Sequence, residues 1–98
     1  MIDINNDKLI TITITERLDA TNADEAREII ENKISSIDKD VLIDVDSLKY
    51  ISSAGLQIIL YIAKEAKAAG KQTFLHGAKG EVGEIFRLSG FLTFLKEI

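Results

Sequence analysis

The sequence predicts an α/β fold with a mixed, mostly parallel sheet and covering helices. Segments with the two-residue hydrophobic period of a strand alternate along the chain with segments that have the longer period of an amphipathic helix. Such alternation is typical of parallel strands joined by crossover helices. The expected order is β-β-α-β-α-β-α-β. Residues 1–98 are expected to form one domain, because 98 residues suit a single small core.

The N-terminal part of the chain predicts a β-hairpin. In residues 8–15, isoleucine alternates with threonine, which is typical of a half-buried strand of β-branched residues. Residues 1–4 predict a weaker strand, and the turn-prone residues 5–7 lie between the two.

Helical periodicity then recurs three times, and the ends of the expected helices carry suitable capping residues. Thr21 or Asn22 is expected to begin the first helix, while Gly70 and Gly90 follow the second and third. The expected helices are residues 21–36, 55–69 and 82–89.

Short apolar runs between and after these helices predict the remaining strands, which are residues 41–43, 73–75 and 91–95. Residues 41–43 are continuously apolar, so a central parallel strand covered on both faces is expected there. Residues 46–53 are expected to be a connection that ends in a pair of serines.

Composition excludes several classes of function. The net charge of −4 disfavours nucleic acid and anionic membrane surfaces, which reward clustered Lys and Arg. The chain has no Cys, and therefore no disulfide or thiolate metal site. No metal or other cofactor is expected. Neither a signal peptide nor an apolar run of 18 residues is present, so a cytoplasmic location is expected.

The segment from Tyr50 to Leu56 is the most unusual local sequence. It reads YISSAGL and places two hydroxyls and two very small residues where a connection becomes a helix. The simpler interpretation is that one serine caps the helix. The functional interpretation is a modification site, because small neighbours leave the hydroxyl open to another protein and a helix N-terminus tolerates a phosphate.

Residues 48–56 closely resemble the signature loop of STAS domains in bacterial anti-sigma factor antagonists, whose core is Asp-Ser-Ser/Thr/Ala-Gly-Leu. Residues 17–22 resemble the family's Gly-x-Leu-Asp segment, although no glycine stands at Glu16 or Arg17. The resemblance extends over nearly the whole chain. It implies phosphorylation of Ser53, with Ser52 as the rival because Ser52 occupies the family's Asp position. The partner-binding surface that it implies consists of Asp19, Thr21, Ser52, Ser53, Ala54, Gly55 and Leu56.

The function implied by this resemblance is that of a binding switch, not an enzyme. The unphosphorylated domain is expected to bind an anti-sigma factor with Ser/Thr kinase activity and so release a sigma factor. Phosphorylation at Ser53 would end that binding, and a metal-dependent Ser phosphatase would reset the switch. A monomer is expected.

Two other classes of function are weighed against this one. The first is a non-phosphorylated STAS adaptor subunit of a transporter complex, either a lipid-transport ABC system or an anion transporter. The second is a small serine hydrolase that uses Ser53 with His76, the only histidine of the chain. The glycine expected upstream of a nucleophile elbow is missing at Ile51.

Overall fold

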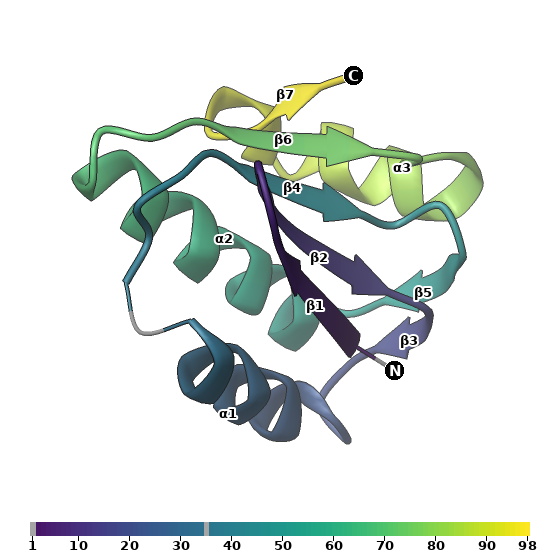
Figure 1. The fold of residues 1–98 in the computed structure, drawn as a ribbon. Coiled ribbons are helices and arrows are strands. Elements are labelled where there is room, and N and C mark those ends of the chain that lie inside the picture. The colour runs from purple at the N-terminus through teal and green to yellow at the C-terminus, as the bar shows by residue number, and fades with distance from the viewer. Residues whose placement is uncertain (1, 35) are drawn as a thin grey trace.

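A five-stranded sheet forms the centre of the protein in the computed structural model, which describes residues 2–34 and 36–98 (Figure 1). Its strand order is β1-β2-β4-β6-β7. β1 runs antiparallel to β2, and every other neighbouring pair is parallel, so the predicted mixed sheet is confirmed. Met1, expected in the first strand, lies outside the described residues. The strands are β1 (Ile2–Asn6), β2 (Ile10–Ile14), β4 (Val41–Asp44), β6 (Thr73–His76) and β7 (Lys96–Glu97).

Three helices connect the parallel strands: α1 (Ala23–Lys33), α2 (Ser53–Ala68) and α3 (Gly80–Leu88). Each crossover moves the chain in the same direction across the sheet, from β2 to β4 to β6 to β7. Since such crossovers are almost always right-handed, all three helices are expected on one face, and α3 passes behind β6 in Figure 1. None of the helices in the described ranges is long and apolar enough to cross a membrane.

The isoleucines of β2 confirm the predicted alternation. Ile10, Ile12 and Ile14 are fully buried, whereas the intervening threonines are only half-buried. The same pattern in β4 corrects one expectation. Leu42 is half-buried between the buried Val41 and Ile43, so β4 is central but fully covered on only one face. The opposite face of the sheet is therefore partly open to solvent.

A separate two-stranded parallel ribbon was not predicted. It consists of β3 (Glu16–Leu18) and β5 (Leu48–Ile51), and β5 lies in the segment expected to be a plain connection. Neither strand alternates between buried and exposed positions, so neither has the two-residue period on which strand prediction depends. The ribbon forms through pairing of segments that lie far apart in the chain.

The expected last strand at residues 91–95 is wrong. Phe91–Thr93 form a 3₁₀ turn, and the strand that pairs with β6 comes later, at Lys96–Glu97. The apolar residues of this segment have spacings of one to four, which suit a helical turn as well as a strand. Gly90 has a φ of 76° and reverses the chain before the turn.

Glu16 has a left-handed backbone conformation, with a φ of 65°, and it is the only described non-glycine residue with a positive φ. This conformation is costly for a residue with a Cβ and free for glycine. The STAS signature has a glycine in this short segment, and Glu16 stands in its place. The departure seen in the sequence therefore corresponds to a strained position.

Replacement Glu16→Gly is expected to raise the free energy of unfolding by about 0.5–1 kcal/mol, because relief of the left-handed strain exceeds the loss of an exposed ion pair. That pair joins Glu16 to Lys49 at 3.7 Å. The control is Glu16→Ala, which removes the ion pair but keeps the strain, and it should give no gain. Urea denaturation of the three proteins measures the difference, and equal stabilities of the glycine and alanine variants would contradict the account.

Candidate functional site

The serine pair stands at the beginning of α2. Ser52 is the N-cap residue, with extended φ and ψ of −101° and 177°. Its backbone oxygen accepts the Leu56 N–H at 2.9 Å, and its hydroxyl oxygen accepts the Gly55 N–H at 3.4 Å. Ser53 is the first residue inside the helix, two positions earlier than the predicted start at residue 55. The simpler interpretation of one serine as a cap therefore holds for Ser52.

Ser53 differs from Ser52 in its exposure to solvent and in the absence of a hydrogen bond to its hydroxyl among the described residues. Its side chain is exposed to solvent, whereas Ser52 is half-buried. Within the described part of the chain, the Ser53 hydroxyl makes no hydrogen bond. It is followed by Ala54, whose side chain is a single methyl group, so little bulk surrounds the hydroxyl. A second protein could reach this oxygen without any movement of the helix.

The loop between β3 and α1 is ordered around Asp19. Its carboxylate accepts hydrogen bonds from the Thr21 backbone N–H at 2.9 Å and from the Thr21 hydroxyl, and it forms an ion pair with Arg17. Its backbone oxygen accepts the N–H of Ala23, at the start of α1, at 2.8 Å. Asp19 is only 5% exposed, so this residue shapes the surface from below.

Asn22 is the N-cap residue of α1, and it is one of the two residues predicted to begin this helix. Its side chain, however, makes no hydrogen bond that caps the helix. Its side-chain oxygen Oδ1 accepts the Asp19 N–H at 2.8 Å, and its side-chain amide nitrogen donates to the Arg17 carbonyl oxygen at 2.9 Å. The side chain therefore fastens the loop to the end of β3.

The hydrogen bonds from the hydroxyl and backbone N–H of Thr21, together with Arg17, lower the pKa of Asp19 below its ordinary value, although burial opposes them. A carboxyl group whose pKa is lower in the folded state stabilises the fold above its unfolded pKa of about 3.9. That contribution is lost as the pH falls through the folded-state pKa.

The wild-type protein is therefore expected to lose stability more steeply below about pH 4–5 than the variant Asp19→Asn, which has no charge to lose. Urea denaturation midpoints of both proteins between pH 7 and pH 3 give the two slopes. Parallel slopes would show that Asp19 does not make this contribution. Asp24→Asn, at an exposed position in the first turn of α1, is the matched control.

Gly55 holds the two loops together. The Ser52 N–H donates to the Leu18 carbonyl oxygen at 3.0 Å, which ties the serine pair to the end of β3. A Cβ at Gly55 would overlap that same Leu18 oxygen and would lie 2.8 Å from Cγ1 of Ile51. Only glycine allows α2 to begin this close to the β3–β5 ribbon. The serine pair at the start of α2 and the Asp19 loop after β3 therefore lie side by side.

The residues predicted for the partner surface therefore occupy different depths. Thr21 and Ser53 are exposed, and Ser52 and Ala54 are half-buried. Asp19, Gly55 and Leu56 are buried, so their contribution to a partner surface is to shape it. Arg17 and Tyr50 were not singled out from the sequence. They lie opposite each other in the β3–β5 register, and the pairing that brings them together has no local signal in the sequence.

The other polar residues that suggest catalysis or metal binding are His76, Asp44 and Asp46. His76 is exposed at the end of β6, and the structure records no hydrogen bond between it and Ser53. Asp44 accepts the Asp46 N–H at 3.0 Å, and Asp46 pairs with Lys79 at 3.1 Å. These carboxylates order the loops after β4 and β6, and in the described ranges no three acidic, His or Cys side chains converge to hold a metal.

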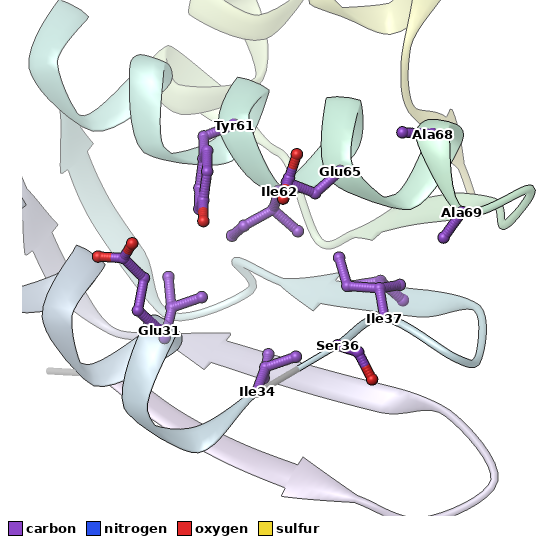
Figure 2. Close-up of a pocket in the computed structure, with 11 residues that line it drawn as sticks. Glu31, Ile34, Ser36, Ile37, Tyr61, Ile62, Glu65, Ala68 and Ala69 are labelled. Atoms are coloured by element: carbon purple, nitrogen blue, oxygen red, sulfur yellow. The ribbon is translucent and has the colours of Figure 1, made fainter.

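A groove of about 400 Å³ lies between α1 and α2 (Figure 2). Its walls combine apolar and polar side chains from both helices, from the segment after α1 and from β4, with Tyr61 near Glu31 at one end. The α2 residues that line it begin at Tyr61 and end at Ala68, towards the C-terminal end of the helix, and the C-cap residue Ala69 also lines it. None of the predicted site residues lines this groove, so it is separate from the serine loop.

The fold and this two-loop surface together define a small α/β binding domain. The family model for the STAS domain matches residues 2–98. The chain therefore belongs to the STAS domain family, as the resemblance of its signature loop predicted.

Three relatives illustrate the similarity. A Bordetella bronchiseptica protein named as a candidate anti-sigma factor antagonist, BtrV, is 32% identical over 76 residues, which are 78% of this chain and 66% of that protein. A crystal structure of a candidate anti-sigma factor antagonist from Thermotoga maritima has a TM-score of 0.85 at 17% identity, covering 99% of this chain and 83% of that one.

The third relative is the anti-sigma factor antagonist SpoIIAA, a Bacillus cell fate determinant. Its unphosphorylated form has a TM-score of 0.79 at 18% identity, covering all of this chain and 86% of that one. Its phosphorylated form has a TM-score of 0.72 at 17% identity, covering 100% and 89%. At these identities the structures show that the fold is shared, and the predicted α/β fold class is confirmed.

Proposed function

We propose that this protein is an anti-sigma factor antagonist that acts by binding, not by catalysis. In its unphosphorylated form it binds an anti-sigma factor Ser/Thr kinase and thereby frees a sigma factor. Phosphorylation of Ser53 by that kinase ends the binding, and a Ser phosphatase restores it. The observation that carries the proposal is the exposed and unbonded Ser53 hydroxyl in the first turn of α2, beside the ordered Asp19 loop.

Ser53 fits a phosphorylation site on both steric and electrostatic grounds. A phosphate adds a charge of about −1.5 to −2, which the positive end of the helix dipole favours at this position. The first turn of α2 contains no acidic residue that would repel the phosphate. The domain can therefore carry the phosphate without unfolding, and the change is confined to its partner surface.

Ser52 is the weaker candidate for the modified residue. Its oxygen already accepts the Gly55 N–H, and its backbone N–H is bonded to Leu18, so a phosphate there would disturb the cap and the link to β3. Loss of such a cap costs about 1 kcal/mol. The resemblance of the signature loop already favoured Ser53. These hydrogen bonds of Ser52 add a physical reason for the same preference.

The test is phosphopeptide mapping. The protein is incubated with ATP and each anti-sigma factor kinase encoded in its genome, and the labelled peptide is identified by mass spectrometry. Wild type and Ser52→Ala are expected to be labelled at residue 53, and Ser53→Ala is expected to remain unlabelled. Undiminished labelling of Ser53→Ala would remove Ser53 as the site. A protein that no such kinase labels or binds is not an anti-sigma factor antagonist of this kind.

A second candidate is a non-phosphorylated STAS adaptor subunit of a lipid-transport ABC or anion transporter complex. The observation that favours it is Ser52, which occupies the position where the phosphorylated relatives' signature loop has an aspartate. Affinity purification separates the two roles. Co-purification of a transporter subunit with an unlabelled protein would select the adaptor, and co-purification of a kinase would select the switch.

A further inference from the structure

Tyr50 exposes an aromatic ring on the β3–β5 ribbon, three residues before Ser53. The residue is 48% exposed, one of four large hydrophobic residues with substantial exposure in the described part of the chain. A shallow hollow lies beside it, lined by Glu16, Arg17, Lys49 and Tyr50. A single exposed aromatic residue is ordinary on a protein surface, so the meaning of Tyr50 depends on the hollow beside it and on its position just before the serine pair.

The ring is held in place by its neighbour across the ribbon. Tyr50 pairs with Arg17 in the parallel register, and the guanidinium carbon of Arg17 lies 5.8 Å from the ring centroid. Arg17 in turn binds the buried carboxylate of Asp19. Arg17 therefore restrains the ring before any partner arrives, which lowers the entropy lost on binding.

The charges around the ring neutralise one another. Arg17 pairs with Asp19, and Lys49 pairs with Glu16 at 3.7 Å. Two positive groups and one negative group line the hollow, and the buried carboxylate of Asp19 neutralises Arg17 from beneath, so these four groups carry no net charge together. An aromatic residue beside an arginine, surrounded by paired polar groups, is the composition typical of an interface anchor. Such a surface suits an apolar side chain of the partner better than a charged one.

The position links the ring to the proposed switch. A chain of contacts runs from Tyr50 through Arg17 to Asp19 and Thr21, and β5 continues directly into Ser52 and Ser53. The hollow beside Tyr50 is therefore continuous with the surface that phosphorylation is proposed to control.

We propose that the Tyr50 ring, backed by Arg17, is an anchor contact for the anti-sigma factor, which packs an apolar side chain against it. This inference rests on the proposed function, because it names a contact of the same complex. It adds the β3–β5 ribbon to the proposed partner surface. The binding energy at the ribbon would come from the apolar contact between the Tyr50 ring and the partner's side chain.

The test compares affinities of unphosphorylated variants for the anti-sigma factor kinase by isothermal titration calorimetry. Tyr50→Ala is expected to weaken binding about ten- to thirtyfold, a typical loss for an aromatic anchor. Tyr50→Phe should retain wild-type affinity, because the ring makes the contact. The loss should be the same at low and high salt, since no net charge is removed. Tyr50→Thr is the second variant, because threonine preserves strand propensity if Tyr50→Ala folds poorly.

Phe94→Ala is the matched control. Phe94 is also a partly exposed aromatic residue, 38% exposed, with the ammonium of Lys67 5.8 Å from its ring. Lys67 lies near the other end of α2, about 20 Å along the helix from Ser53. This variant should bind as wild type does.

Two outcomes would overturn the inference, and they can be told apart. Wild-type affinity of both Tyr50→Ala and Tyr50→Thr would show that the ring is no anchor, while the proposed function would remain. Absence of binding by the unmodified wild-type protein to any such kinase would remove the proposed function and this contact with it.

Discussion

Replacing Gly55 with alanine is expected to destabilise the protein by about 2 kcal/mol, which lowers the melting temperature by roughly 10 °C for a domain of this size. The added methyl group would overlap the Leu18 carbonyl oxygen, and a backbone atom cannot move aside cheaply. The gain in helix propensity of about 1 kcal/mol offsets only part of this cost. Thermal unfolding followed by circular dichroism measures the change.

The same substitution should also weaken partner binding, because it separates the start of α2 from the Asp19 loop. Gly83→Ala in α3 is the matched control. Its new methyl group would lie 2.9 Å from the Ala78 carbonyl oxygen, a less severe approach than that at Gly55, so a clearly smaller loss of stability is expected. A melting temperature of Gly55→Ala equal to that of wild type would contradict the proposed contact between the two loops.

Ser53→Asp is expected to weaken binding of the anti-sigma factor by about tenfold or more, because a charge must then be desolvated in the interface. Ser53→Ala should bind as the unmodified protein does and should remain bound in the presence of ATP. Calorimetry without ATP compares the affinity of the aspartate variant with that of the unmodified protein. The alanine variant is also measured with ATP present.

Ser52→Asp is the matched control for that prediction. It introduces the same charge one residue earlier, where an aspartate can cap the helix by accepting the Gly55 N–H, as Ser52 now does. It also restores the residue of the STAS signature loop. We expect Ser52→Asp to bind nearly as tightly as wild type, and equal losses for Ser52→Asp and Ser53→Asp would show that charge alone, irrespective of position, weakens the complex.

The parts of the fold that could be predicted are those whose residues carry a periodic signal. The alternation of Ile10, Ile12 and Ile14 predicted a half-buried strand, and Gly70 ended α2 in a left-handed conformation as expected. The short strands β3 and β5 have no such signal, since their partners lie about 30 residues away in the chain. Their existence depends on pairing, which local sequence does not encode.

The residues of the candidate site also fall into those that could be recognised from the sequence and those that could not. The serine pair and its small neighbours could be recognised from residue types alone, because a helix start with two hydroxyls has a readable chemistry. The burial of Asp19 and the exposure of Tyr50 could not, since both follow from the ribbon that brings Arg17 beside them. In the structure, Asp19 organises the loop through its hydrogen bonds with Thr21 and its ion pair with Arg17.

We propose that a phosphate on Ser53 switches off partner binding. The most direct measurement is the affinity of one anti-sigma factor kinase for the unmodified protein and for the protein phosphorylated at Ser53, both determined by calorimetry without ATP. The phosphorylated form is expected to have a dissociation constant about a hundredfold higher, equivalent to about 3 kcal/mol. Equal affinities of the two forms would contradict it.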